Sequence, residues 1–225
     1  MNVLAVASRK GGSGKSTLTA HLAAHAHGLS QSCLLIDDDP QGSLWLWNEL
    51  RKKNALPLKN VTRGIADILK REKQNGVEWV FIDTPPNMSV SVTDAIEAAT
   101  LLIIPCRPGV FDLMAVRETI GCARKARTPY AVVINGAPAK RGKVESPSVT
   151  YARECLATWA VPVWSGQITQ RASFSLALAE GEGVKEFDFD SSSAAEIGRL
   201  WLAIERSVKA VNDAREGTGM HSAAA

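Results

Sequence analysis

The sequence Lys-Gly-Gly-Ser-Gly-Lys-Ser-Thr at residues 10–17 decides the fold. It follows an apolar run, Val3–Ala7, that is typical of a buried strand, and it opens a segment of helical period. Gly11, Gly12 and Gly14 allow such a loop to turn tightly and to point backbone N–H groups at a polyphosphate. The order of strand, glycine-rich loop and helix therefore indicates a phosphate-binding loop.

The side chains of the same loop carry the chemistry. A lysine at this place supplies a mobile cation to the β- and γ-phosphates, and the hydroxyl that follows it binds Mg²⁺. The common pattern G-x-x-x-x-G-K-[ST] requires a glycine where this chain has Arg9, and the variant that fits is K-G-G-x-G-K-[ST]. The alternative is a glycine-rich turn with an accidental Lys-Ser. We predict ATP binding by Lys10, Gly11, Gly12, Ser13, Gly14, Lys15, Ser16 and Thr17.

Carboxylates end two further apolar runs. Asp37 follows Leu34-Leu35-Ile36 and continues into Asp38-Asp39-Pro40, and Asp83 follows Val80-Phe81-Ile82. An acid at the end of a strand can lie behind a phosphate-bound metal, and one well-placed carboxylate suffices to orient an attacking water. The alternative interpretation, an N-cap for the next helix, applies best to Asp38.

Short runs rich in Val, Ile and Leu alternate with segments of helical period along the whole chain. This alternation predicts an α/β P-loop NTPase fold, a mostly parallel twisted sheet with helices on both faces. The expected strands are Val3–Ala7, Cys33–Ile36, Trp79–Ile82, Leu101–Ile104, Ala131–Ile134 and Val161–Trp164. The expected helices are 15–28, 42–53, 62–74, 88–98, 111–127, 147–159, 171–180 and 192–214. We expect a single domain over residues 1–216 and a disordered tail over residues 217–225.

Composition sets limits on the class of protein. The net charge of +3 is too small to demonstrate a polyanionic partner by itself. No apolar stretch approaches the ~18 residues of a membrane span, so we expect a cytoplasmic protein. The four cysteines contain no C-x-x-C pair, which argues against a zinc or iron–sulfur site; they are Cys33, Cys106, Cys122 and Cys155.

These motifs together resemble the ParA/MinD family, whose deviant Walker A loop opens with an additional lysine, here Lys10. The resemblance implies that this lysine reaches the nucleotide of a second subunit. The segment around Asp39 resembles the family's D-x-D-P-Q loop, which implies that Asp39 orients the attacking water and that Asp37 supports the loop and the water shell of the metal. Asp83, in a match to h-h-h-D-[TC]-P-P, is then expected to contact Mg²⁺.

Two later segments resemble the small plasmid-partition members of this family, of the ParF type. They are Ile103–Pro108 and Ile168–Arg171. Asn135, which ends a strand, stands where the family often contacts adenine, although a turn-forming asparagine is the alternative. The resemblance implies an ATP-dependent homodimer that binds DNA non-specifically and associates with the nucleoid. A ParB-like, centromere-binding or cargo-adaptor partner would stimulate hydrolysis, and no membrane would be involved.

Other functions remain as alternatives. They are a metabolic ATP-dependent enzyme of the same P-loop group and a MinD-like spatial regulator. Iron–sulfur carriers should show clustered cysteines, and a tyrosine-kinase domain a tyrosine-rich tail; this chain has only Tyr130 and Tyr151.

Non-specific DNA binding requires cations gathered on one surface. The candidates are Lys140, Arg141, Lys143, Arg171, Arg199, Arg206 and Lys209. In the last helix the opposite side is apolar, which predicts a core-facing stripe of Ile197, Leu200, Trp201, Ile204, Val208 and Val211. His21 and His25 lie four residues apart, a spacing that can bind a metal, but no third ligand is suggested and we interpret them as an ordinary helix surface.

Overall fold

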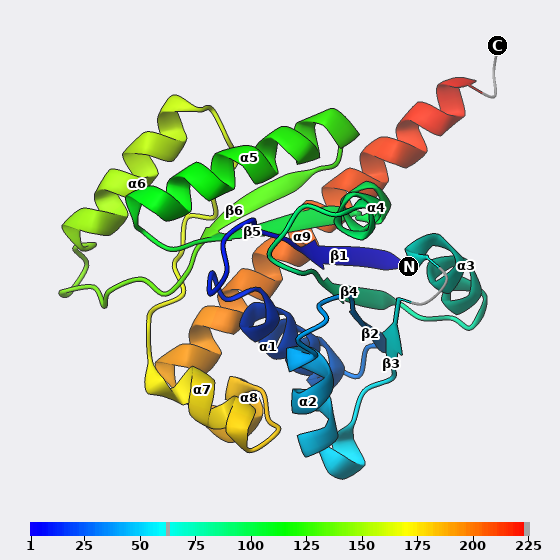
Figure 1. The fold of residues 1–225 in the computed structure, drawn as a ribbon, viewed down its shortest axis with the longest axis horizontal. Coiled ribbons are helices and arrows are strands. Elements are labelled where there is room, and N and C mark those ends of the chain that lie inside the picture. Colours follow the sequence, from blue (N-terminus) through cyan, green and yellow to red (C-terminus); the bar gives the residue numbers. More distant parts are fainter. Residues whose placement is uncertain (62–63, 223–225) are drawn as a thin grey trace.

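The computed structural model describes residues 1–61 and 64–222. Its centre is a parallel sheet in the order β3-β2-β4-β1-β5-β6 (Figure 1). The strands are β1 Asn2–Val6, β2 Cys33–Asp37, β3 Leu58–Asn60, β4 Trp79–Asp83, β5 Leu101–Cys106 and β6 Tyr130–Ile134. All pairings in this sheet are parallel, so the strands end at one common edge. The predicted α/β P-loop fold is confirmed.

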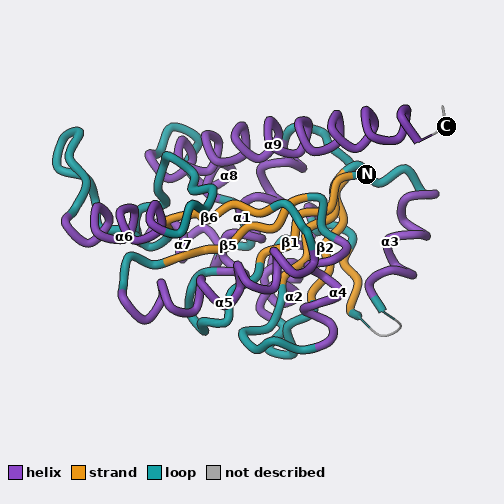
Figure 2. Tube along the Cα trace, turned by 90° about the horizontal axis from the view of Figure 1, so that it is seen from above, coloured by secondary structure: helices purple, strands orange, loops and turns teal. Residues whose placement is uncertain are grey.

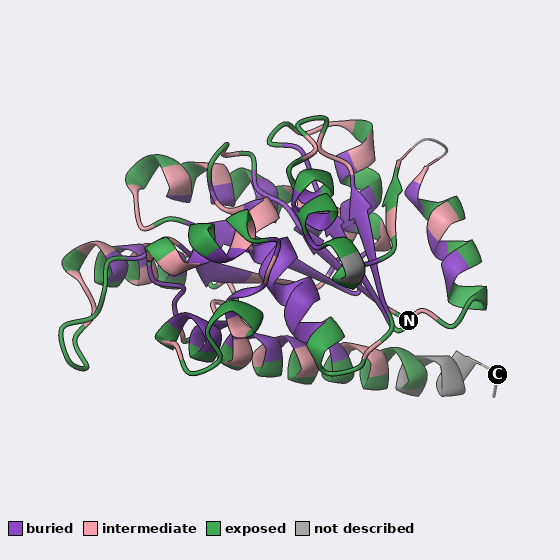
Figure 3. Ribbon diagram, turned by 90° about the horizontal axis from the view of Figure 1, so that it is seen from below, coloured by how far each residue is buried: buried purple, intermediate pink, exposed green. Residues whose placement is uncertain are grey.

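Helices cover both faces of the sheet, and Figure 2 shows α9 on one side and α5 on the other. Successive strand residues point to opposite faces; Leu4 and Val6 belong to one buried cluster, and Val3 and Ala5 to the other. The strands other than the edge strand β3 are accordingly buried throughout most of their length (Figure 3). The helices are α1 Lys15–Gly28, α2 Ser43–Leu50, α3 Ile65–Gln74, α4 Val90–Ala98, α5 Val110–Ala126, α6 Pro147–Thr158, α7 Ala172–Ala179, α8 Val184–Phe187 and α9 Ser192–Ser222.

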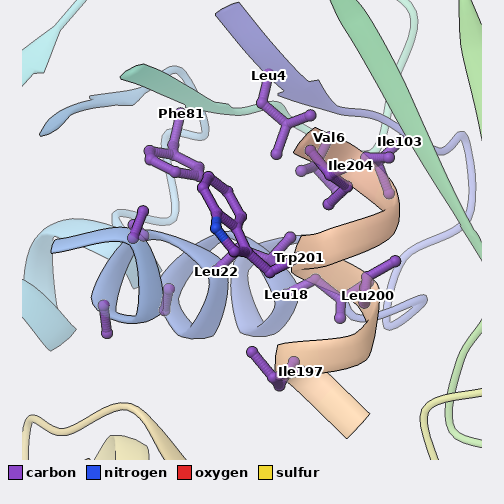
Figure 4. Packing of buried hydrophobic residues seen from close by; sticks show 14 of the residues in the cluster. Leu4, Val6, Leu18, Leu22, Phe81, Ile103, Ile197, Leu200, Trp201 and Ile204 are labelled. Carbon is purple, nitrogen blue, oxygen red and sulfur yellow. The ribbon is translucent and has the colours of Figure 1, made fainter. Parts of the chain in front are cut away.

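The apolar stripe of α9 packs where the sequence predicts it, over β1, β4 and α1. Trp201 is 1% exposed, and its ring centroid lies 4.6 Å from that of Trp79 and 6.0 Å from that of Phe81. Figure 4 shows Leu18 and Leu22 of α1 beside the same indole. Such tilted aromatic contacts add to the free energy gained by burying apolar surface. This cluster fixes α1, and with it the loop that precedes α1.

The structure corrects several expected boundaries. Val161–Trp164 is not a sheet strand: only a single bridge joins Val163 to Val132, because Pro162 has no N–H to extend the pairing. The three-residue strand β3 and the single-turn helix α8 carry no periodicity and were not predicted. Helix α9 continues to Ser222 instead of ending near residue 214, since no proline interrupts it. Residues 62–63, at the expected start of α3, and 223–225 of the expected tail lie outside the described part.

The two histidines of α1 do not form a helix surface. His21 and His25 are only 1% and 7% exposed. Nδ1 of His21 accepts a hydrogen bond from the backbone N–H of Val184 at 3.2 Å, and its ring meets that of Phe174 edge to face. Burial lowers the pKa of both side chains to about 4, so they are neutral parts of the core at pH 7. The i, i+4 spacing placed them on one face, but that face points inward.

Candidate functional site

The ends of three strands bring the predicted acidic residues together. In the strand register Asp83 is the partner of Val6 on one side and of Asp37 on the other. The phosphate loop follows β1 directly and ends at Lys15, the first residue of α1. Gly12 and Gly14 have φ values of 71° and 93°, a left-handed backbone that favours glycine. The loop and both carboxylates therefore lie at one edge of the sheet, at the N-terminus of α1.

A cavity of about 500 Å³ opens above this edge. It brings Lys15 and Ser16 of the loop to the same space as Asp39 of the loop after β2. Lys15 is 6% exposed, and burial lowers the pKa of its ammonium group although Asp83 and Asp39 act to raise it. The lining is Gly11, Gly12, Gly14, Lys15, Ser16, Thr17, Ala20, Asp39, Gln41, Ser43, Trp47, Pro86, Arg107 and Leu178.

Asp83 is fully buried, and in the part of the chain that the structure describes neither of its carboxylate oxygens has a hydrogen-bond partner. Burial raises its pKa to about 7; Asp37 and Asp39 act in the same direction, and Ser16 and Lys15 oppose it. A buried carboxylate without a partner costs free energy. Magnesium binds oxygen ligands and keeps part of its water shell, so Asp83 beside the Ser16 hydroxyl fits Mg²⁺ held together with a nucleotide phosphate.

Among the described residues, no group of three or more His, Cys, Asp or Glu side chains could hold a metal ion by itself. A cation here would therefore need oxygen ligands from a bound phosphate or from water. This agrees with the small number of protein ligands that Mg²⁺ uses in nucleotide sites. The chemistry that such a cation would supply is neutralisation of the phosphate charge.

The loop after β2 is held by its own carboxylates. Asp37 accepts hydrogen bonds from the backbone N–H groups of Asp39 at 3.2 Å and of Trp45 at 2.9 Å. Asp39 in turn accepts one from Gln41 N–H at 3.0 Å, and Asp38 N–H donates to the carbonyl of Asp83 at 3.0 Å. Burial raises the pKa of Asp37, which these backbone donors partly offset. Asp37 therefore shapes the loop, while Asp39 lines the cavity.

Asn135 braces the phosphate loop. Asn135 is 7% exposed, and its side-chain amide donates a hydrogen bond to the carbonyl oxygen of Ser13 at 2.7 Å. A Cβ at position 14 would lie 2.2 Å from Nδ2 of Asn135, so the close packing also requires Gly14. Asn135 lines a second cavity of about 160 Å³, which shares Gly14, Thr17, Arg107 and Leu178 with the first. The predicted contact with adenine stays a prediction.

Arg107, Trp47 and Leu178 line the cavity although the sequence did not single them out as site residues. Arg107 follows the end of β5 directly, at the same edge as the acidic residues. Its position after a strand was the available signal. Trp47 and Leu178 come from helices α2 and α7, whose packing against each other no local pattern reveals.

Lys10, by contrast, is absent from the cavity lining. Its ammonium group lies 5.7 Å from the centroid of the Phe111 ring, at the start of α5. The side chain is half-buried, beside the exposed Gly11 and Gly12. The structure thus separates the two lysines of the loop, with Lys15 inside the cavity and Lys10 outside it.

The proposed DNA contacts fall into separate places. Arg171 is not a free surface cation, because its guanidinium lies 2.8 Å from the buried carboxylate of Glu196 and lines the smaller cavity. Lys140 pairs with Glu145 at 3.1 Å in the loop before α6, which also carries the exposed Arg141 and Lys143. This loop and the C-terminal end of α9 lie at opposite ends of the molecule (Figures 1 and 2). The three candidates on α9, Arg199, Arg206 and Lys209, are all exposed, as is Arg215 of the same helix.

No helix in the described part of the chain has the length and apolar character needed to cross a membrane.

Comparison with known proteins agrees with this geometry. The family model of the CobQ/CobB/MinD/ParA nucleotide binding domain matches residues 4–184. Maintenance of carboxysome distribution protein A from Halothiobacillus neapolitanus is 29% identical over 204 residues, covering 86% of this chain and 91% of that protein.

Two solved structures share the fold. MinD from Aquifex aeolicus superposes with a TM-score of 0.71 at 19% identity, covering 91% of this chain and 97% of that one. An ATP complex of a McdA variant from Cyanothece superposes with a TM-score of 0.66 at 19% identity, covering 96% of each chain. With residues 4–184 matched by the family model and the phosphate loop at the edge of the sheet, the chain belongs to the CobQ/CobB/MinD/ParA family and is a ParA/MinD-type P-loop protein.

Proposed function

We propose that this chain is a positioning ATPase that hydrolyses Mg·ATP, dimerises when ATP is bound and distributes a cargo over DNA. One observation carries the proposal: Lys15, Ser16 and Asp39 line one cavity with the buried Asp83 beside Ser16 and Lys15, while the second lysine of the loop, Lys10, lies outside it. A loop that served only its own nucleotide would have no evident use for a lysine in that position.

The residues divide the chemistry among them. Lys15 and the loop N–H groups would hold the phosphates, and Ser16 with Asp83 would hold the metal. Asp39 would orient the attacking water, since phosphoryl transfer needs positioning and charge stabilisation more than covalent help. Asp37 would keep Asp39 in place through its backbone hydrogen bonds.

Lys10 would act in a second subunit. ATP carries more negative charge at its outer end than ADP, so a lysine from a facing copy gains more from ATP. Dimerisation would then depend on the γ-phosphate. Two copies would also double any basic surface, which makes non-specific DNA binding ATP-dependent without a new contact.

The cargo is proposed from likeness alone. The relative from Halothiobacillus neapolitanus is named for maintaining carboxysome distribution, and the match spans most of both chains. This favours a protein assembly as cargo, with a plasmid or a chromosome region as the alternative. In either case an adaptor or centromere-binding partner would link the cargo to the ATPase and stimulate hydrolysis.

The experiment compares two variants with the wild-type chain by light scattering and by ATP hydrolysis. Lys10→Ala should bind ATP but stay monomeric, because its cation is missing from the facing site. Asp39→Ala should bind ATP, dimerise and hydrolyse slowly. If both variants form dimers with ATP, the role of Lys10 across the interface is wrong. If the wild-type chain stays monomeric with ATP, a metabolic enzyme of the same family becomes the better proposal.

A further inference from the structure

The start of the phosphate loop is attached to helix α5 at two places. Arg9 forms an ion pair with Glu118, and its backbone N–H donates to the hydroxyl of Thr119 at 3.4 Å. Lys10 lies over the ring of Phe111, with 5.7 Å between the ammonium nitrogen and the ring centroid. Residues seven apart lie on the same face of a helix, so Phe111 and Glu118 hold consecutive loop residues along one face of α5.

Phe111 is exposed to an unusual degree for its type. It is 79% exposed and lies in the first turn of α5. Aromatic side chains normally bury most of their surface, so packing in the core does not explain this phenylalanine. Its one described ring contact with a charge is Lys10. A cation within about 6 Å of an aromatic face is attracted by the ring.

We propose that Phe111 is a positioning residue for Lys10. The ring holds the ammonium group outside the cavity of its own subunit and presents it toward a second copy of the chain. This inference rests on the proposed ATP-dependent dimer. Without the ring, the flexible side chain of Lys10 would be drawn toward the phosphates bound by its own loop, because the next two residues, Gly11 and Gly12, carry no side chains to obstruct it and no atom lies within 4 Å of where a Cβ would stand. Fewer subunits would then have Lys10 ready for the facing site.

The expected effect is modest. An exposed cation–π contact corresponds to about a two- to fivefold change in an equilibrium constant. Each subunit of the dimer would contribute one such contact, so the factor for the dimer dissociation constant is the product of the two subunits' factors.

The first test measures the ATP-dependent dimer dissociation constant by analytical ultracentrifugation. Phe111→Leu keeps an apolar side chain and removes the ring, and it should weaken the dimer by about two- to fivefold per subunit. Phe111→Tyr keeps the ring and should retain wild-type affinity. Met114→Ala is the matched control, since Met114 is also exposed on the first turns of α5, at 54%, and this variant should keep the wild-type constant.

The second test is independent of dimerisation. In the nucleotide-free monomer, the aromatic ring should shift the NMR signal of the Lys10 ε-methylene group upfield, and Phe111→Leu should abolish this shift while Phe111→Tyr keeps it. Lys10→Ala assigns the signal. Equal dimer affinity in the wild type and Phe111→Leu, or equal loss in the Leu and Tyr variants, overturns the positioning role. A wild-type chain that shows the shift but stays monomeric with ATP refutes the proposed function itself, and the role that rests on it.

Discussion

Two pairs of opposite charges in this molecule differ in whether their hydrogen-bonding groups have partners. Arg51, at the end of α2, has a side chain only 1% exposed, and its guanidinium makes two hydrogen bonds of 2.8 Å to the carboxylate of Glu186. It also donates to the carbonyls of Asn54 at 3.0 Å and Gly181 at 3.1 Å. Around the phosphate loop, Lys15 and Asp83 are also buried, but among the described residues neither carboxylate oxygen of Asp83 has a hydrogen-bond partner.

The difference separates charges that stabilise the fold through satisfied hydrogen bonds from charges that a bound ligand could satisfy. Burial alone would raise the pKa of Glu186, but the hydrogen bonds from Arg51 and from Gly183 N–H hold it below its ordinary value. For Asp83 burial prevails, and its pKa is raised to about 7. A satisfied pair stabilises its surroundings once formed, whereas an unsatisfied charge is a cost that binding can offset. Four predictions test this contrast.

The largest effect concerns the pH dependence of stability at Asp83. Its folded pKa of about 7 lies above the unfolded value of 3.8, so the folded chain retains a proton that the unfolded chain loses. The stabilisation is therefore complete below about pH 4 and is lost as the pH rises to about 7, by as much as about 4 kcal/mol. Asp83→Asn should remove this part of the slope in urea titrations of the nucleotide-free chain. Parallel curves for both chains would show that Asp83 ionises normally.

Breaking the satisfied pair should lower stability directly. Arg51→Ala leaves the carboxylate of Glu186 half-buried without its partner, which should reduce the free energy of unfolding by about 3 kcal/mol. Urea denaturation measures this. Arg199→Ala, at an exposed arginine of α9, is the matched control and should change stability by less than about 0.5 kcal/mol. Equal midpoints for the two variants would refute the structural role of the pair.

Removing Lys15 should act on binding instead of stability. Lys15→Ala should weaken ATP binding roughly 10- to 100-fold, since a hydrogen bond to a charged group contributes about 1.5 to 3 kcal/mol. The stability of the nucleotide-free chain should fall little, because burial already disfavours this cation. Calorimetry gives the affinity, and urea denaturation gives the stability. Unchanged ATP affinity in a folded variant would contradict the assignment of the phosphate loop.

The comparison also explains what the sequence alone could predict. Local order sufficed for the phosphate loop and for the acids that end β2 and β4, because parallel strands place their carboxyl ends at one edge. The pairing of Arg51 with Glu186 joins residues far apart in the chain, and no local pattern marks it. The same holds for Asn135, whose bond to the Ser13 carbonyl depends on how β6 lies beside the loop.

Exposure was the least predictable property. The apolar stripe of α9 packs inward as expected, yet His21 and His25 also face the core because α1 is covered by α9 on one side and by α7 and α8 on another. Arg171 was expected on the surface, but it forms an ion pair with the buried Glu196, which also accepts a hydrogen bond from the hydroxyl of Thr169. In each case the partner comes from a helix that follows later in the chain. Periodicity identifies a face but does not say what will cover it.

The smallest effect concerns DNA, where the contrast between paired and unpaired charges identifies the better candidate. Arg206 is exposed and has no ion pair among the described residues, whereas the ammonium group of Lys209 lies 2.7 Å from the carboxylate of Asp213. Each phosphate contact releases counterions and adds about one to the slope of log affinity against log salt. A cation already paired with a carboxylate has less to gain from a phosphate.

Under the proposed function, the ATP-bound chain should bind arbitrary duplex DNA at low salt and the ADP-bound chain should not. Arg206→Ala should reduce the salt slope by about one per subunit, while Lys209→Ala should reduce it less. Fluorescence anisotropy over a range of salt concentrations measures both slopes, with ATP affinity as the check that the site is intact. If the two variants lose the same slope, the ion pair with Asp213 does not protect Lys209. If neither loses any, α9 is not the surface that meets DNA, and the loop carrying Arg141 and Lys143 is the next to test.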